Sequence, residues 1–117
     1  TNPIFPAVAT ESRIRWAGLA PETFAWYTTY ENIGYCKTKP DYYREILRYL
    51  GCRAEDCLMV GNDVEEDMMA AQAAGLSVFL LTDCLLNRKE KDISSYPQGD
   101  FDALLAFVEE WGGEASL

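Results

Sequence analysis

The chain has 117 residues, of which 49% are hydrophobic and 25% charged, so it has enough apolar residues to build a core and is not disordered by composition. Ten basic residues against nineteen acidic ones give a formal net charge of -9, which argues against nucleic acid or an anionic membrane as the main partner. The absence of histidine excludes Ser-His-Asp and Cys-His catalysis.

The four cysteines are scattered and show no Cys-x-x-Cys spacing. Without that spacing and without histidine we expect no zinc site. Scattered thiols are typical of a reducing compartment, so we expect a cytoplasmic protein. The apolar runs at residues 57–60 and 76–81 have the length of strands rather than of membrane spans, and no charged leader precedes an apolar stretch. Because the chain starts at Thr1 rather than at methionine, we expect a fragment or a processed product.

The first half of the chain predicts two helices with a strand between them. Residues 7–17 have helical character and end at Gly18. Residues 24–30 are rich in aromatic side chains and threonine, the composition of a strand. Residues 40–50 predict a helix that starts at Pro40, ends at the capping Gly51, and buries one face. That face is expected to comprise Tyr42, Tyr43, Ile46, Leu47 and Leu50.

The second half predicts two strands, each followed by a helix. Residues 58–60 form the first strand, and residues 64–74 form a helix closed by Gly75. Residues 77–81 are continuously apolar, as in a strand buried on both faces. Residues 85–99 are polar and irregular, and residues 101–111 predict a terminal helix. Alternating strands and helices indicate an α/β fold with a parallel sheet, in a single domain.

A cluster of polar and acidic residues follows the strand at residues 58–60 directly. Parallel α/β sheets bind ligands at the carboxyl ends of their strands, and clustered oxygen atoms are what Mg²⁺ requires. Asp63 and Asp67, four residues apart, can share one face of the following helix. A structural interpretation is equally open, because Asn62 or Asp63 would cap that helix and Glu65 and Glu66 would complement its dipole.

Two further segments have weaker signals. In Lys37-Thr38-Lys39-Pro40-Asp41, a lysine stands just ahead of a helix that starts with proline, which suggests an anion site, although a solvated loop lysine is the commoner case. Thr1-Asn2 offers a hydroxyl group and backbone amides at the start of a turn, but terminal residues usually fray.

Taken in order, Thr1, Lys39-Pro40 and the run from Val60 to Asp63 with Asp67 resemble the C-terminal half of the haloacid dehalogenase (HAD) superfamily of phosphohydrolases. The resemblance extends from Thr1 to about Asp83. It implies that a Thr holds the substrate phosphate, that a Lys balances the charge of nucleophile and phosphate, and that acids bind Mg²⁺.

Carried onto this chain, the resemblance implies Thr1 and Lys39 as catalytic residues, with Asn2 beside them in the substrate site. It implies Asn62, Asp63 and Asp67 as the metal site, and which of the three ligates directly stays open because Asn62 separates Gly61 from the first acid. The implied reaction is attack of an aspartate on a small phosphorylated metabolite, followed by hydrolysis of the aspartyl-phosphate.

The first motif of that family, Asp-x-Asp-x-Thr/Ser, does not occur in the chain. The resemblance therefore implies a partial Rossmann-like parallel sheet with flanking helices that lacks the central strand bearing the nucleophile. Unpaired strand edges are costly, so we expect the missing N-terminal segment of a longer parent, or a second copy, to complete the sheet. The chain alone is expected to have negligible turnover, and the upstream location of the family's cap domain leaves the substrate open.

Two alternatives are a receiver-like binding module and a degenerate HAD-like domain without activity. Receiver-like domains also pair strand-end acids with a lysine, but their acids come early in the chain and their lysine late. Here the lysines precede the acids, which disfavours the receiver-like alternative. An Asp-x-Asp-x-Thr/Ser motif upstream of Thr1 would favour the enzyme over the degenerate domain.

Overall fold

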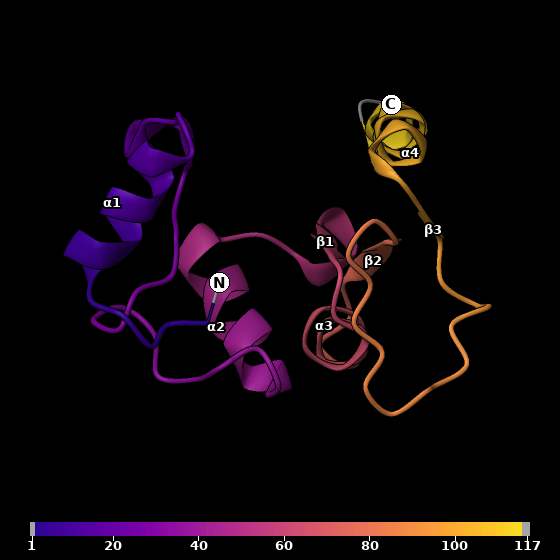
Figure 1. Cartoon of the computed structure of the whole chain (residues 1–117), viewed down its shortest axis with the longest axis horizontal. Helices are drawn as coiled ribbons and strands as arrows, with labels where there is room; N and C mark the ends of the chain where they lie inside the picture. Colours follow the sequence, from indigo (N-terminus) through magenta and orange to yellow (C-terminus); the bar gives the residue numbers. More distant parts are fainter. Residues whose placement is uncertain (1, 116–117) are drawn as a thin grey trace.

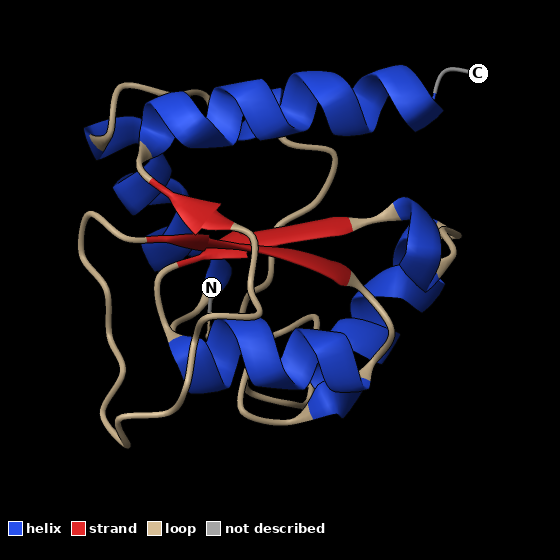
Figure 2. Ribbon diagram, turned by 90° about the vertical axis from the view of Figure 1, so that its right-hand side faces the viewer, coloured by secondary structure: helices blue, strands red, loops and turns tan. Residues whose placement is uncertain are grey.

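A computed structural model describes the backbone of residues 2–115 and the side chains as far as residue 111. It is an α/β structure around a three-stranded parallel sheet in the order β1-β2-β3 (Figures 1 and 2). The strands are β1 (Leu58–Gly61), β2 (Ser77–Leu81) and β3 (Gln98–Gly99). The predicted fold class is confirmed, and the predicted bounds of the strand at residues 77–81 are those of β2.

Helices cover both faces of this sheet. The short helix α3 lies on one side of the strands and α4 on the other, while α1 stands apart from the sheet (Figure 1). The helical elements are α1 (Ala7–Trp16), α2 (Pro40–Leu50), a π-helical segment (Val64–Met69) that continues as α3 (Ala70–Ala73), α4 (Phe101–Ala115), and the short 3-10 segments Pro21–Thr23 and Ala54–Asp56. In the described part of the chain, no helix combines the length and the apolar character that crossing a bilayer requires.

The core lies between β2 and the segment that follows β1. Val64, Met68 and Leu80 are almost completely buried there. On the opposite face of β2, the ring of Phe79 packs against Phe107 of α4 with 5.1 Å between ring centroids. Strand β2 is thus covered on both sides, which explains its continuous apolar sequence.

Helix α2 begins and ends where its local signals predict. Pro40 occupies the first turn, and Gly51 adopts the left-handed conformation (φ 67°) that closes the helix. Tyr42 and Tyr43 are buried, and the Tyr43 hydroxyl donates to the backbone oxygen of Glu66 at 2.6 Å. This bond ties α2 to the π-helical segment. Leu50, which we expected on the buried face, is 42% exposed.

Three predicted elements differ from the structure. Residues 24–30 form no strand, because no strand lies beside them in the described chain and β structure requires a paired neighbour. The helix predicted at residues 64–74 begins as a π-helix and ends at Ala73. The region predicted as irregular, residues 85–99, contains β3 at its end, where Gln98 and Gly99 pair with β2.

Candidate active site

Asp63 lies just beyond the end of β1, and only 4% of the residue is exposed. One carboxylate oxygen, Oδ1, accepts hydrogen bonds from the backbone N–H groups of Glu65 and Glu66, both at 3.0 Å. The other oxygen, Oδ2, accepts a hydrogen bond from Arg88 Nη1 at 2.6 Å. The capping interpretation is therefore confirmed for Asp63, and the cap leaves Oδ2 facing a side chain rather than the helix.

The environment of Asp63 favours its charged form. Burial by itself would raise the pKa of this carboxyl group, but the amide of Glu66, the Arg88 guanidinium and the amide of Glu65 outweigh it. Together these donors hold the pKa of Asp63 below its usual range.

Asp67 is more deeply buried, at 1% exposure, and is held by three donors. Its Oδ2 accepts from the backbone N–H groups of Asn62 and Asp63, both at 3.0 Å, and its Oδ1 accepts from Lys37 Nζ at 2.7 Å. The carboxylate of Asp67 thus lies against the backbone of the turn that follows β1. The backbone between the two acids is π-helical, with Met68 N bonded to Asp63 O at 3.3 Å. Such wide turns are frequent at functional sites.

Gly61 makes room for the Asp67 side chain. A Cβ atom at position 61 would lie 2.5 Å from Asp67 Cβ and closer still to the carboxylate. Real Cβ atoms essentially never approach other atoms so closely, and the Asp67 side chain cannot swing away without losing its three hydrogen bonds. The glycine before the acids is therefore required by the packing of Asp67 beneath the loop.

The structure brings Lys37, rather than Lys39, to the acids. Lys37 Nζ lies 2.7 Å from Asp67 Oδ1 and 3.9 Å from Glu66 Oε2, and the Lys37 side chain is 18% exposed. Lys39 is exposed at the N-cap position of α2, where its side chain makes no capping bond. The sequence pattern favours the lysine next to the proline, and no local signal distinguishes two lysines in one loop. The role predicted for Lys39 stays a prediction, while the geometry favours Lys37 for it.

Asn2 joins the same network, and its predicted place in the substrate site stays a prediction. Its Oδ1 accepts from the backbone N–H of Lys37 at 2.7 Å, and its Nδ2 donates to Glu66 Oε2 at 3.2 Å. Asn2 therefore links the N-terminal segment to the lysine loop and to the acid cluster. Thr1, to which we gave the phosphate-binding role, lies outside the described residues.

A second loop, residues 82–97, is fastened to the acid loop by three hydrogen bonds. Asn62 Nδ2 donates to the carbonyl of Cys84 at 2.7 Å, Leu86 N donates to Asn62 O at 2.8 Å, and Val64 N donates to Leu86 O at 3.0 Å. These bonds place Arg88 against Asp63. The sequence alone does not identify Arg88, because nothing in a polar loop marks one arginine as the partner of a distant acid.

Of the four carboxylate oxygens of Asp63 and Asp67, one is better placed than the others to bind a divalent cation. Three of the four carboxylate oxygens of Asp63 and Asp67 are bonded to backbone amides or to the mostly buried Lys37. The fourth, Asp63 Oδ2, faces the exposed side chain of Arg88. Among the described residues no three acidic or cysteine side chains gather closely enough to hold a metal ion alone. Asp63 is thus the residue best placed to offer Mg²⁺ an oxygen ligand, and the predicted ligand roles of Asn62 and Asp67 stay predictions.

The lowered pKa of Asp63 predicts how stability depends on pH. A carboxyl group whose pKa is lower in the folded state stabilises the fold above its unfolded pKa of about 3.9, and that contribution disappears as the pH falls through the folded value. The D63N substitution should remove this component, so the variant should lose less free energy of unfolding than the wild type on acidification. Urea denaturation at neutral pH and at a pH well below ~4 measures the difference. Equal losses in the two proteins would contradict the prediction.

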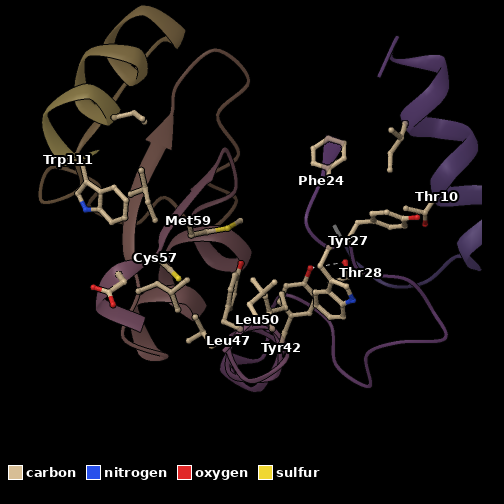
Figure 3. Close-up of a pocket in the computed structure, with 18 residues that line it drawn as sticks. Thr10, Phe24, Tyr27, Thr28, Tyr42, Leu47, Leu50, Cys57, Met59 and Trp111 are labelled. Carbon is tan, nitrogen blue, oxygen red and sulfur yellow. Dashed lines mark hydrogen bonds between the residues drawn. The ribbon is translucent and has the colours of Figure 1, made fainter. Parts of the chain in front are cut away.

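An open apolar groove of about 720 Å³ lies beside β1. In Figure 3, Cys57 and Met59 stand on one side of it, Phe24 and Tyr27 on the other, and Leu50 at its base. Within the described chain β1 pairs only with β2, so its other edge is unpaired on the groove side. An apolar, unprotected strand edge next to an apolar groove is typical of a sheet that continues.

Comparison with known proteins agrees with this geometry. A family model described as haloacid dehalogenase-like hydrolase matches residues 5–75, which include the Lys37 loop and both buried acids. The glyceraldehyde 3-phosphate phosphatase of Methanothermobacter thermautotrophicus is 36% identical to the chain over 64 residues, which are 55% of this chain but only 28% of that protein. No solved structure matches. Because the family model covers more than half of the chain, the chain belongs to the haloacid dehalogenase-like hydrolases.

Proposed function

We propose that the chain supplies the cationic and metal-binding half of a Mg²⁺-dependent phosphatase that acts through an aspartyl-phosphate. The observation that carries the proposal is the buried network of Lys37, Asp67 and Asp63 at the carboxyl end of β1. Membership of a hydrolase family and similarity to a protein named as a phosphatase support it. The substrate is a small phosphorylated metabolite.

The residues of the network have separate tasks in this proposal. Lys37, held in place by Asp67 and by the bond from its own backbone N–H to Asn2, presents an ammonium group to the phosphate and the nucleophile. Asp63 offers Oδ2 to the metal, while its Oδ1 stays bonded to two amides. When bound, Mg²⁺ neutralises negative charge on the transferring group. Thr1 hydrogen-bonds a phosphate oxygen.

The reaction needs a nucleophile from outside the described chain. An aspartate carboxylate attacks phosphorus, the bond to the leaving alcohol oxygen breaks, and that oxygen takes up a proton. Water then hydrolyses the aspartyl-phosphate, which releases inorganic phosphate and restores the carboxylate.

The groove beside β1 is the place for the segment that bears this aspartate. We propose that its occupant is an apolar β-structure segment from the rest of a longer protein, which pairs with the unpaired edge of β1. Leu58 and Met59 line the groove from β1, and Phe24 and Tyr27 stand on its far side (Figure 3). A strand that runs parallel to β1, as β2 does, would end near Asp63, where the nucleophile has to stand.

The test uses the protein expressed from its complete reading frame, compared with residues 1–117 alone. We expect the complete protein to hydrolyse p-nitrophenyl phosphate with Mg²⁺ and to lose that activity in EDTA, and the 117-residue chain to be inactive. A complete protein that binds Mg²⁺ but does not hydrolyse the phosphate ester would instead support the alternative of a degenerate HAD-like domain. Light scattering on the complete protein distinguishes the two ways of completing the sheet, because a monomer fits the proposed segment and an obligate dimer fits strand exchange with a second copy.

A further inference from the structure

Arg88 and Lys37 hold the two buried acids in different ways. Lys37 is itself mostly buried, with 18% of its side chain exposed, and it is bonded to Asp67 Oδ1. Arg88 lies 2.6 Å from Asp63 Oδ2, but 60% of its side chain is exposed. Asp63 and Asp67 are both buried, so each acid needs a cation beside it, and the two pairs differ in the cation. Most of the Arg88 side chain already contacts water, so Arg88 loses little when another cation takes its place at Asp63, whereas Lys37 would have to leave a mostly buried position.

The loop that carries Arg88 keeps its position independently of the Arg88–Asp63 contact. Backbone hydrogen bonds from Leu86 N to Asn62 O and from Val64 N to Leu86 O anchor it beside the acid loop. The Asn62 side chain adds a third bond, to Cys84 O. The Arg88 side chain can therefore swing away from Asp63 while its backbone stays in place.

We propose that Arg88 is the reversible counter-ion of Asp63: its guanidinium holds Oδ2 in the metal-free protein and must leave before a divalent cation binds there. This inference rests on the proposed function, because it takes Asp63 as a metal ligand. Two cations compete for one oxygen atom, so Arg88 weakens metal binding and, in return, stabilises the metal-free site. Arg88 is thus a positioning residue that acts through Asp63.

The experiment measures Mg²⁺ binding by isothermal titration calorimetry on the complete protein and its variants, without substrate. We expect R88Q to bind Mg²⁺ about tenfold more tightly than the wild type, which corresponds to about 1.4 kcal/mol. R88K, which keeps the charge but has a single ammonium head, should lie between the two. Raising the salt concentration should reduce the difference in Mg²⁺ affinity between wild type and R88Q, because salt screens exposed charges such as that of Arg88.

K89Q is the matched control. Lys89 belongs to the same loop, has the same charge and is 68% exposed, but it lies 3.6 Å from Glu65 instead of contacting Asp63. We expect K89Q to change Mg²⁺ affinity by less than about twofold, since rim charges contribute little.

Three outcomes would overturn the inference. If R88Q binds Mg²⁺ as the wild type does or more weakly, Arg88 only stabilises the loop. If R88Q and K89Q gain Mg²⁺ affinity equally, the effect comes from net charge and not from the contact with Asp63. Wild-type protein that binds no Mg²⁺ at all, together with R88Q that binds none, would overturn the proposed function as well. If the wild type binds Mg²⁺ and R88Q binds it no more tightly, the proposed function stands and only the role of Arg88 is overturned.

Discussion

Replacing Gly61 with alanine is expected to lower the free energy of unfolding by about 3 kcal/mol or more, the combined cost of overpacking and of lost buried hydrogen bonds. The new methyl group would overlap the Asp67 side chain, which is bonded to Asn62 N, Asp63 N and Lys37 Nζ. Either β1 shifts or Asp67 gives up its partners. Urea denaturation of the complete protein measures the loss, and phosphatase activity should fall with it.

Gly34→Ala is the control for this substitution. A Cβ atom at position 34 would meet nothing within 4 Å, and the residue is exposed. We expect its effect on stability to stay within about 0.5 kcal/mol. A Gly61→Ala variant as stable as Gly34→Ala would show that the Asp67 carboxylate is not held beneath the loop as described.

The second large effect is expected from Lys37→Met. Removing the ammonium group leaves the nearly inaccessible carboxylate of Asp67 with two amide donors and no counter-ion. Breaking a buried ion pair typically costs about 3–5 kcal/mol, and the remaining amide bonds lower the expected loss to about 2–4 kcal/mol. The proposed phosphatase activity should fall by roughly 100-fold or more, because the proposal places this ammonium group next to the transferring phosphate.

Lys39→Met tests the alternative that the sequence favoured. Lys39 is two residues away in the same loop and is exposed, so the substitution should change stability by less than about 0.5 kcal/mol and leave most of the activity. Urea denaturation and turnover of the two variants show which lysine stabilises the site and supports activity. If Lys39→Met were the inactive variant and Lys37→Met the active one, the assignment made from the structure would be wrong.

The sequence by itself determined the elements whose signals are local. Pro40 and Gly51 set the ends of α2, because a missing N–H suits a first turn and a left-handed residue suits a helix end. The continuous apolar run at residues 77–81 predicted β2 with its bounds. The spacing of Asp63 and Asp67 after a strand predicted that the two side chains can share a face. The structure bonds the Asp67 carboxylate to the backbone N–H of Asp63, and a shared ligand role of the two acids stays a prediction.

Only the tertiary structure decided the features that depend on distant neighbours. Residues 24–30 have strand composition but form no strand, because a strand exists only where another pairs with it. Lys37 rather than Lys39 contacts Asp67 because the fold of the loop, fastened by Asn2, decides which ammonium group reaches this acid. Arg88 meets Asp63 through a loop that is docked 25 residues further along the chain. Contacts of this kind follow from how the segments pack together, and no local pattern of residues encodes them.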